Sequence, residues 1–407
     1  MSAIDVTTAP DLGVSEPGLA CPSCGALGLA IFHEQAEIPV HSVRLVETYE
    51  EALEFPRGSL RLGFCERCGF ITNTAYDPGP QDYAIAYEET QGFSPRFREF
   101  SRDLAARWID RYDLRGKDVL EIGSGKGEFL VDMCELGVDA GVGIDPSYIE
   151  GRLTSPAADR ITFIKDYYAE AHAPLTGDAV VCRHTLEHIH ETGELVRIVK
   201  RSLAGRDGTV VLFELPDVLR VLREVAFWDV YYEHCSYFTP GSLARLFRQN
   251  GFDVLDLALD YDDQYILIEC KPSAGTPTGP LALEEDPAEV AQDVRGFRRS
   301  LAATRRRWQD ELASARADGR RTVIWGAGSK GVSFLTTLGI QEEIEYAVDV
   351  NPFKHDKFMA GTGQRVVSPE FLREYRPDVV IAMNPIYLEE IGAQLASLDL
   401  APRLVAV

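Results

Sequence analysis

The stretch that most constrains this chain is residues 119–130, which read Val-Leu-Glu-Ile-Gly-Ser-Gly-Lys-Gly-Glu-Phe-Leu. A short apolar run enters a turn that contains three glycines, and an amphipathic helix follows. Glycine tolerates positive φ and allows a ligand to approach the backbone closely. The first turn of the helix then offers N–H groups that no helical carbonyl uses. The stretch therefore predicts a ligand-binding turn between a strand and a helix of an α/β sheet.

Two acidic residues narrow the kind of ligand that this turn can bind. Glu121 precedes the turn, where its charge would oppose a phosphate group. Asp145 follows the next apolar run, about 20 residues on, where an acid can accept both ribose hydroxyls of a nucleoside. A glycine turn without a phosphate, followed by a ribose acid, resembles the S-adenosylmethionine site of class I methyltransferases. The alternatives are a dinucleotide-binding fold and a degenerate copy of one. The predicted cofactor residues are Glu121, Gly123, Ser124, Gly125, Gly127 and Asp145.

The chain after this turn alternates apolar runs with helical patterns, as a methyltransferase domain requires. The predicted elements are strands at 161–164, 178–182 and 208–214, a helix at 242–250, and a closing hairpin of 253–259 and 264–270. Ligands of open α/β sheets lie at the carboxyl ends of the strands. Three more residues are therefore predicted at the cofactor cleft, namely Asp166, Arg183 and His184, although Asp166 could equally be an exposed acid.

An aromatic connector, residues 76–100, precedes the glycine turn and contains Tyr87. It either closes over the cofactor, which makes Tyr87 a candidate cofactor contact, or packs the preceding module onto the next domain.

Two Cys-x-x-Cys pairs stand near the N-terminus, Cys21 with Cys24 and Cys65 with Cys68. Each pair forms a tight turn that directs two thiolates to one point, and two such turns complete a tetrahedral zinc site. All four positions are thiolates, so no position is left open for a reacting water, and the zinc is expected to be structural. The alternatives are reduced thiols without metal and a redox role, although a redox role would need only one pair.

A second glycine turn lies near the C-terminus, after a predicted strand at 322–325. It reads Gly326-Ala-Gly-Ser-Lys-Gly331, and Asp349 follows about 18 residues later, which matches the dinucleotide fingerprint. This turn either binds a nucleotide or merely packs within a Rossmann-like fold. A last predicted strand, 378–382, delivers Asn384 and Tyr387 to the same edge.

The length of 407 residues and these motifs predict an α/β chain of several domains. The predicted division is a flexible tail at 1–19, a zinc module at 20–75, a class I methyltransferase domain at 76–271, a linker at 272–287 and a C-terminal Rossmann-like domain at 288–407. The linker is rich in Pro, Gly, Thr and acids, and the helix that follows it carries a run of three arginines, 305–307, expected on a solvated face.

The formal net charge of −23 argues against nucleic acid or an anionic membrane as a partner. An anionic small substrate would need a local basic pocket. No apolar run approaches the roughly 20 residues of a membrane span, and the N-terminus lacks the charge and apolar core of a signal peptide. A cytoplasmic location is expected, and the sequence does not indicate an oligomeric state.

One aromatic stretch, residues 227–238, follows the fifth strand of the methyltransferase domain, where such enzymes commonly contact substrate. His234 is its best general base, since a free histidine titrates at roughly 6.5. Tyrosine hydroxyls such as that of Tyr231 can donate to an oxyanion. Adjacent side chains diverge in regular structure, so Glu233 and His234 converge only where the backbone is irregular. The alternative for His234 is a buried, hydrogen-bonded core histidine.

The order of a four-cysteine module, a methyltransferase domain and a second Rossmann-like domain resembles the sugar C-methyltransferases. The resemblance runs from Cys21 onward and is carried by the four cysteines, the turn 123–127, Tyr231-x-Glu233-His234, Trp325–Gly331 and Asn384-Pro-Ile-Tyr387. It implies that the substrate is a nucleotide-linked keto-deoxysugar and that Tyr231, Glu233 and His234 line the active site, with the histidine as base. It also implies substrate contacts at Tyr232, Tyr237, Gly326, Gly328, Lys330, Asn384 and Tyr387. Residues 227–228 and 235–238 depart from the best-known sugar enzymes, which leaves the identity of the sugar open.

Carbon methylation requires a carbanion equivalent, which a neighbouring ketone makes accessible. The expected mechanism has His234 remove the proton while Tyr231 or His184 stabilises the enolate oxygen, after which the enolate attacks the sulfonium methyl group. O-methylation of a small molecule is the near alternative. A zinc-containing NAD-dependent oxidoreductase that uses the 326–331 turn, and a non-catalytic binding protein, are more distant ones.

Overall fold

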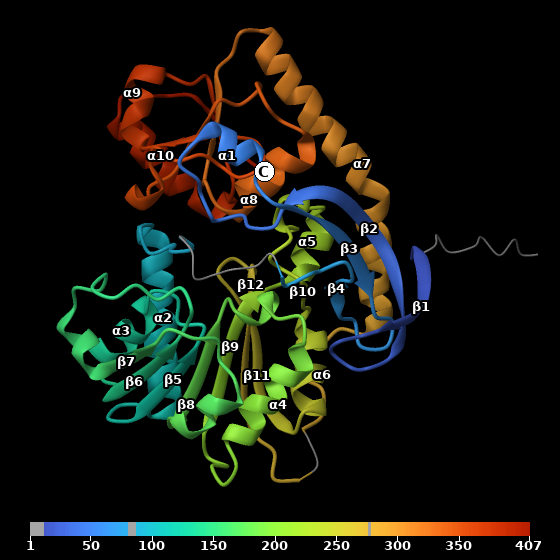
Figure 1. Ribbon diagram of the computed structural model, residues 1–407, viewed down its shortest axis with the longest axis vertical. Helices are drawn as coiled ribbons and strands as arrows, with labels where there is room; N and C mark the ends of the chain where they lie inside the picture. Colours follow the sequence, from blue (N-terminus) through green and yellow to red (C-terminus); the bar gives the residue numbers. More distant parts are fainter. Residues whose placement is uncertain (1–11, 80–86, 276–277) are drawn as a thin grey trace, which may run out of the picture.

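A computed structural model describes residues 12–79, 87–275 and 278–407 of the chain. Figure 1 shows a central domain below, a C-terminal domain above it, and an N-terminal module beside the junction of the two. In the described part of the chain, no helix combines the length and the apolar character needed to cross a membrane.

The central domain is built on a seven-stranded sheet with the order β11-β12-β9-β8-β5-β6-β7. Its strands are β5 (Asp118–Ile122), β6 (Ala140–Ile144), β7 (Ile161–Ile164), β8 (Ala179–Arg183), β9 (Val210–Pro216), β11 (Phe252–Asp260) and β12 (Tyr265–Pro272). Strands β5 to β9 are parallel, whereas β12 runs antiparallel to both β9 and β11. This sheet with its closing hairpin agrees with the predicted class I methyltransferase fold, and the predicted strands differ from the observed ones by at most two residues at either end.

Helices cover both faces of this sheet because its central strands are apolar on both sides. The helices α2 (Pro95–Tyr112) and α3 (Glu128–Glu135) pack Trp108 and Leu130 against one face, in one apolar cluster with Val181. The helices α4 (Thr192–Ser202) and α6 (Pro240–Gln249) pack against the other face, in a cluster that includes Val180. A parallel sheet buried on both faces leaves only its edges for ligands, and the carboxyl edge faces the C-terminal domain (Figure 1).

The N-terminal module is a five-stranded antiparallel sheet with the order β1-β2-β3-β4-β10, accompanied by the short helix α1 (Tyr49–Leu53). Its strands are β1 (Val14–Ala20), β2 (Leu27–Pro39), β3 (Arg57–Phe64), β4 (Ile71–Asn73) and β10 (Ser236–Tyr237). Strand β10 comes from the aromatic stretch of the central domain, so the two parts share one sheet. Val14–Ala20 pairs with β2, which corrects the prediction of a flexible tail for that part of 1–19; residues 1–11 lie outside the described residues.

The C-terminal domain is a five-stranded parallel sheet with the order β15-β14-β13-β16-β17. Its elements are β13 (Thr322–Trp325), α8 (Ser329–Leu338), β14 (Tyr346–Val348), β15 (Arg365–Val367), α9 (Leu372–Tyr375), β16 (Val379–Ala382), α10 (Leu388–Ser397) and β17 (Arg403–Ala406). The described part of the chain also contains α5 (Val218–Glu224) and the short 3₁₀ helices η1 (Pro156–Arg160), η2 (Glu170–Leu175), η3 (Leu186–His188), η4 (Phe227–Asp229), η5 (Pro352–Lys354), η6 (Pro369–Phe371) and η7 (Pro385–Tyr387).

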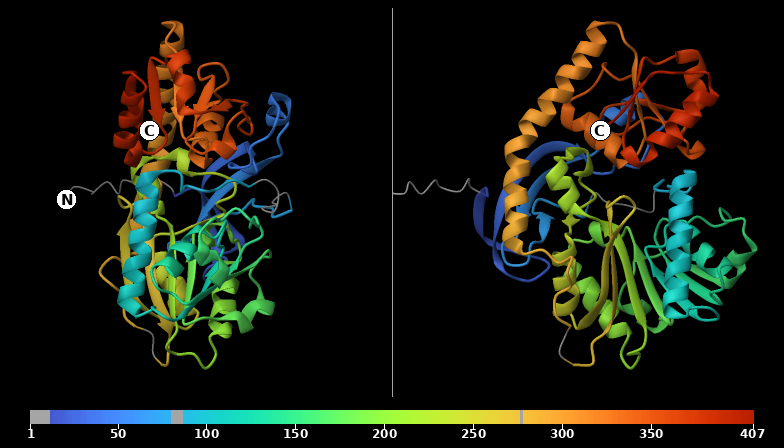
Figure 2. Two further views of the ribbon diagram at one scale, coloured as in Figure 1. Left: turned by 90° about the vertical axis from the view of Figure 1, so that its left-hand side faces the viewer. Right: turned by 180° about the vertical axis from the view of Figure 1, so that it is seen from behind.

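One long helix, α7 (Pro287–Ala317), runs from the N-terminal module to the C-terminal domain (Figure 2). Asp286 caps its first turn, and Glu289 returns the hydrogen bond. Phe297 packs edge-on against Phe32 of β2, whereas Trp308 packs against Phe334 of α8. The helix therefore holds the two outer parts at fixed positions around the carboxyl edge of the central sheet.

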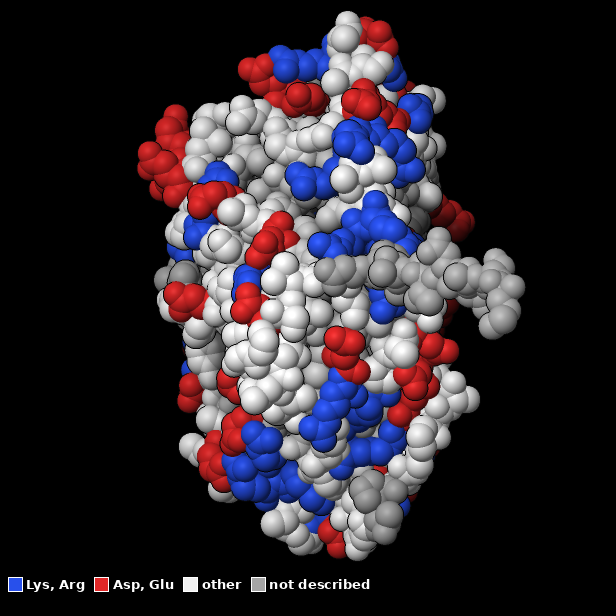
Figure 3. All heavy atoms as spheres, turned by 90° about the vertical axis from the view of Figure 1, so that its right-hand side faces the viewer, with Lys and Arg blue, Asp and Glu red and all other residues white. Residues whose placement is uncertain are grey.

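Figure 3 views the side of the molecule along which α7 runs, where Lys and Arg side chains stand in groups separated by acidic and uncharged residues. Arg306 and Arg307 are exposed, as predicted, whereas Arg305 donates to the carbonyl of Thr337 and is half-buried.

Candidate active site

A cavity of about 1230 Å³ lies between the carboxyl edge of the central sheet and the C-terminal domain. The glycine turn after β5, the ends of β6 and β8, the loop around His234 and the second glycine turn all line it. A typical ligand pocket measures about 300–1,000 Å³, so this cavity has room for a cofactor and a second substrate together.

The glycine turn after β5 has the backbone that its sequence predicts. Gly123, Gly125 and Gly127 have φ values of 70°, 53° and 89°. A Cβ atom at Gly123 would lie 1.9 Å from Oγ1 of Thr185, and one at Gly127 would lie 2.4 Å from the Phe163 ring. Both the left-handed conformation and the close neighbours therefore require glycine here.

Asp145 is fixed beside this turn by two backbone N–H groups. Its Oδ2 atom accepts from the N–H of Gly125 at 2.9 Å, and its Oδ1 atom accepts from the N–H of Ser147 at 2.7 Å. The carboxylate lines the cavity and retains acceptor capacity, since each of its oxygens has two lone pairs. This geometry agrees with its predicted role as a ribose acceptor.

Glu121 lies beneath the turn and is only 2% exposed. Its Oε2 atom has no hydrogen-bond partner in the described part of the chain. Burial raises the pKa of Glu121 to about 8, although Arg183 opposes that rise. Burial therefore favours the protonated form of Glu121 at neutral pH.

Asp166 lies at the cavity beyond β7, and its side chain is 61% exposed. One of its oxygens accepts from the N–H of Tyr167 at 2.8 Å, and the other lies 3.5 Å from Nε2 of His172. The contact of Asp166 with an adenine amine stays a prediction.

Arg183 reaches the cavity wall, but its guanidinium already has partners. Nε donates to Oε2 of Glu214 at 2.6 Å, and the group lies 4.0 Å from the ring centroid of Phe129. This ion pair joins the ends of β8 and β9, and a contact of Arg183 with the cofactor stays a prediction.

His184 has a φ of 47°, a strained value for a residue other than glycine. Its Nε2 atom lies 2.8 Å from Oε1 of Glu214 and its Nδ1 atom 3.6 Å from Glu187. Burial acts to lower the pKa of His184, but the two carboxylates outweigh it and raise that pKa to about 9. The raised pKa favours an imidazolium at the cavity wall, and a role for His184 as an enolate donor stays a prediction.

His234 and Tyr231 form the pair that the sequence predicts. The hydroxyl of Tyr231 lies 3.2 Å from Nε2 of His234, and both residues line the cavity. Burial, with help from nearby His188 and His184, holds the pKa of His234 well below 6.5, while burial raises the pKa of Tyr231. A neutral imidazole thus stands beside a protonated phenol at the edge of the cavity. His188, to which the sequence assigned no chemical role, has its ring centroid 4.8 Å from that of His234.

Glu233 points away from His234, into the N-terminal module. It is 1% exposed and lies 3.0 Å from Nδ1 of His41, while it accepts from the N–H of Ser42 at 2.7 Å. Tyr232 and Glu233 form a turn, and Glu233 is held by His41 and Ser42 while His234 lines the cavity. The prediction that Glu233 is catalytic is corrected: it anchors the loop that carries His234.

Two predicted substrate contacts are also corrected. The hydroxyl of Tyr232 bonds with the backbone of Asp77, and that of Tyr237 bonds with the backbone of Tyr231. Both tyrosines are buried, and neither lines the cavity, because their rings build the core between the N-terminal module and the central domain. Tyr87 does line the cavity, as predicted.

The predicted residues of the C-terminal domain converge on the opposite wall. Gly326, Gly328, Lys330, Asn384 and Tyr387 all line the cavity. The amide of Asn384 exchanges two hydrogen bonds, of 2.8 and 3.1 Å, with the amide of Gln264 at the tip of the β11–β12 hairpin. The hydroxyl of Tyr387 bonds with that of Tyr261 at 2.7 Å.

Lys330 belongs to a cationic cluster that the sequence alone did not reveal. Its Nζ atom lies 3.0 Å from the carboxylate of Asp229, and Arg220 binds the same carboxylate. Arg220 also pairs with the more exposed Glu224 at 2.8 Å. Two half-buried cations around one half-buried acid give the cavity a basic point in a strongly acidic chain.

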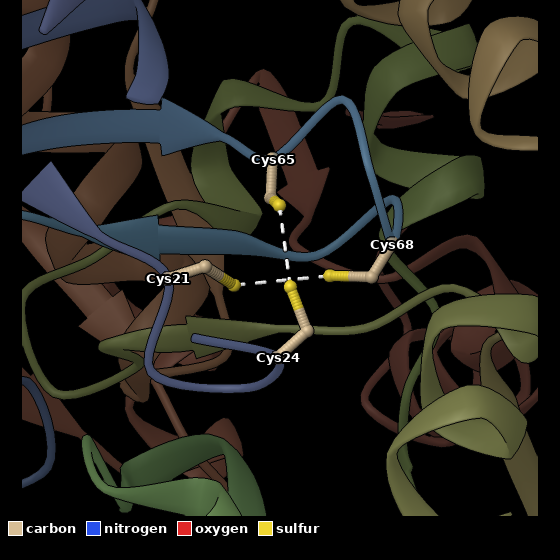
Figure 4. Close-up of side chains that lie close together, drawn as sticks. All are labelled: Cys21, Cys24, Cys65 and Cys68. Atoms are coloured by element: carbon tan, nitrogen blue, oxygen red, sulfur yellow. Dashed lines mark hydrogen bonds between the residues drawn. The ribbon is translucent and has the colours of Figure 1, made fainter. Parts of the chain in front are cut away.

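The four cysteines of the N-terminal module converge on one point from two loops (Figure 4). The sulfur atoms of Cys21 and Cys68 are 3.7 Å apart, as are those of Cys24 and Cys65. A tetrahedron with zinc–sulfur bonds of about 2.3 Å has edges of about 3.8 Å. The four thiols therefore fit a zinc ion, with no position left for a substrate.

We expect purified protein to contain one zinc ion per chain and the Cys21→Ser variant to lose it. Loss of the ion should also lower the midpoint of thermal unfolding, because three of these cysteines share an apolar cluster with Phe238 and the central sheet. Metal analysis and calorimetry measure both effects, and Cys134→Ser, which removes a buried thiol of α3, is the control that should keep its zinc. Unchanged zinc in Cys21→Ser would contradict the assignment.

Comparisons with known proteins agree with this geometry. Residues 94–257 match the model of a methyltransferase domain family, and residues 281–401 match that of the C-methyltransferase C-terminal domain. The chain is 28% identical to the C-methyltransferase NovU of Streptomyces niveus over 315 residues, 71% of this chain and 72% of that protein.

Solved structures that share the methyltransferase fold align with less than half of this chain. One is a 1,6-didemethyltoxoflavin-N1-methyltransferase of Burkholderia thailandensis with bound S-adenosylhomocysteine (18% identity, TM-score 0.34, 44% of this chain and 80% of that one). Another is a magnesium protoporphyrin IX methyltransferase of Synechocystis (18% identity, TM-score 0.35, 44% and 84%).

Proposed function

We propose that this chain is an S-adenosylmethionine-dependent C-methyltransferase that methylates a carbon next to the ketone of a nucleotide-linked keto-deoxysugar. The observation that carries the proposal is the pair of Tyr231 and neutral His234, which stands in one cavity between two glycine turns. One turn suits the cofactor and the other suits a second nucleotide.

In this proposal the cofactor lies on the turn from Gly123 to Gly127, with its ribose on Asp145 and its adenine near Asp166. The fixed carboxylate of Asp145 and the close approach that the glycines allow support this position. Glu121 lies where the positive charge of the cofactor would offset the cost of its burial.

The nucleotide-sugar would lie against the C-terminal domain. A diphosphate entering a chain of net charge −23 needs local cations, and Lys330 and Arg220 supply them around Asp229. Gly328 precedes the first turn of α8, whose N–H groups can also bind an anion. The amide pair of Asn384 and Gln264 lines the same wall and offers polar contacts to the ligand.

His234 would remove the proton from the carbon beside the ketone, since its low pKa keeps it unprotonated. Tyr231, whose raised pKa keeps its hydroxyl protonated, would donate to the enolate oxygen. A bound S-adenosylmethionine would supply the methyl group: the enolate carbon would bond to it, the methyl–sulfur bond would break, and S-adenosylhomocysteine would leave. His234 returns its proton to solvent. The zinc would hold the N-terminal module and take no part in the reaction, and a cytoplasmic location belongs to the same proposal.

Mass spectrometry of reactions between methyl-labelled cofactor and a panel of nucleotide-linked keto-sugars tests this function. We expect a labelled product with the methyl group on carbon for at least one such sugar. Exchange of the adjacent C–H with deuterium in solvent should accompany it, because O-methylation breaks no C–H bond. Labelled product on oxygen, or turnover only with acceptors that carry no nucleotide, would overturn the proposal.

We also expect cofactor binding to release a proton. Burial raises the pKa of Glu121 to about 8 in the free protein, and a bound cation lowers it, so at pH 7 binding ionises the acid. Affinity should rise with pH from about 6 to 8 and level off once Glu121 is already ionised. Calorimetry in buffers of different ionisation enthalpy measures the released proton, and Glu121→Gln should release less.

A further inference from the structure

Lys126 stands inside the glycine turn, between Gly125 and Gly127, yet its side chain is fully buried. Its ammonium donates to the carbonyl oxygen of Tyr87 and to Oε2 of Glu89, each at 2.9 Å. A buried ammonium requires such partners, because removing them would leave an uncompensated charge. Lys126 therefore fixes the segment 87–92, called here the cofactor strap, across the mouth of the turn.

The strap is held from the other side by Glu88. Its two carboxylate oxygens accept from the guanidinium of Arg152, each at 2.7 Å, and one of them also accepts from the amide of Asn351 at 2.8 Å. Arg152 belongs to the central domain and Asn351 to the C-terminal domain. Neighbouring Glu89 is thus oriented before any ligand binds.

Glu89 lies on the ribose side of the turn. Its Oε1 atom would be 2.9 Å from a Cβ atom at Gly125, the same residue whose N–H donates to Asp145. Both carboxylates line the cavity. Burial raises the pKa of Glu89 to about 7, and the charge of Asp145 adds to that rise. Two carboxylates around one glycine need hydrogen-bond donors between them, and a ribose supplies two hydroxyl groups.

We propose that Glu89 is a cofactor-binding residue that accepts a hydrogen bond from one ribose hydroxyl while Asp145 accepts from the other, and that Lys126 positions Glu89. This inference rests on the proposed position of the cofactor. The proposal places a second ribose acceptor in the strap. The sequence motifs, namely the glycine turn and Asp145, did not indicate it.

The test is calorimetry with S-adenosylhomocysteine and with its 2′-deoxy and 3′-deoxy analogues. Glu89→Gln keeps the shape of the side chain but removes its charge, so we expect about 10-fold weaker binding of S-adenosylhomocysteine. For the analogue that lacks the hydroxyl bound by Glu89, the variant and the wild type should bind alike. The wild type should bind S-adenosylhomocysteine more tightly than that analogue. Lys126→Met should reduce this difference in affinity, whereas Lys126→Arg should restore part of it. Glu99→Gln, an exposed charge change on α2, is the control and should bind within twofold of wild type.

The other outcomes distinguish the role of Glu89 from the position of the cofactor. If Glu89→Gln binds like wild type while Asp145→Ala binds weakly, the role of Glu89 is overturned and the cofactor position stands. If both variants bind like wild type, the cofactor position itself fails and this inference fails with it. If Glu89→Gln weakens S-adenosylhomocysteine and both analogues equally, Glu89 only holds the strap, and the ribose contact is overturned.

Discussion

The His234→Asn variant should bind S-adenosylmethionine normally and turn over about 10²–10⁴-fold more slowly, the usual cost of losing a general base. Asparagine keeps a polar group near the hydroxyl of Tyr231 but cannot accept a proton from carbon. The variant should also lose any exchange of the substrate's acidic C–H with deuterium. Steady-state kinetics, calorimetry with the cofactor, and mass spectrometry of exchanged substrate measure these three properties.

His190→Asn is the matched control, because His190 is more exposed, pairs with Glu191 and lies outside the cavity lining. It should keep wild-type turnover and exchange. Near wild-type turnover in His234→Asn would refute the proposed base and direct attention to His188, whose ring is the adjacent imidazole.

The role of His234 as general base also predicts an unusual acid limb of the pH–rate profile. A base must be unprotonated, and the pKa of His234 lies well below 6.5 because of burial. We therefore expect kcat/KM to stay level as pH falls through 6.5 and to decline only at lower pH. A decline centred near 6.5 would indicate a solvated histidine instead.

The elements and the glycine turn were predictable because their signals are local in sequence. Strand β7 covers residues 161–164 and β13 covers residues 322–325, as the apolar runs predict, and Asp145 follows the turn by the interval that a strand–helix–strand unit requires. The edge strand Val14–Ala20 was missed because it lacks alternation and contains both Pro and Gly.

The orientation of individual site residues was not predictable, because partners distant in sequence decide it. Glu233 meets His41 across 192 positions of the chain, and Lys330 meets Asp229 across 101. No local pattern encodes such pairs. The resemblance carried Glu233 into the active site, whereas its bonds with His41 and Ser42 hold it in the N-terminal module.

Replacing Asp145 by Ala should weaken cofactor binding by about 10–10²-fold, because one charge-assisted hydrogen bond to the ribose is lost, worth roughly 1.5–3 kcal/mol. The carboxylate also holds the N–H groups of Gly125 and Ser147, so part of the loss could come from a loosened turn rather than from the ribose. A control with the same local damage is needed to separate the two causes.

The C-terminal domain provides that control in Asp349. Its Oδ2 atom accepts from the N–H of Ala327 at 2.9 Å and its Oδ1 atom from the N–H of Asn351 at 2.9 Å, the same arrangement as at Asp145. Asp349→Ala should therefore loosen the second turn to a similar extent yet leave the affinity for S-adenosylmethionine unchanged. It should weaken the nucleotide-sugar instead, since Lys354 loses its carboxylate partner at that wall. Equal cofactor affinity in Asp145→Ala and wild type, or equal losses of cofactor affinity in the two variants, would show that the first turn is not the cofactor site.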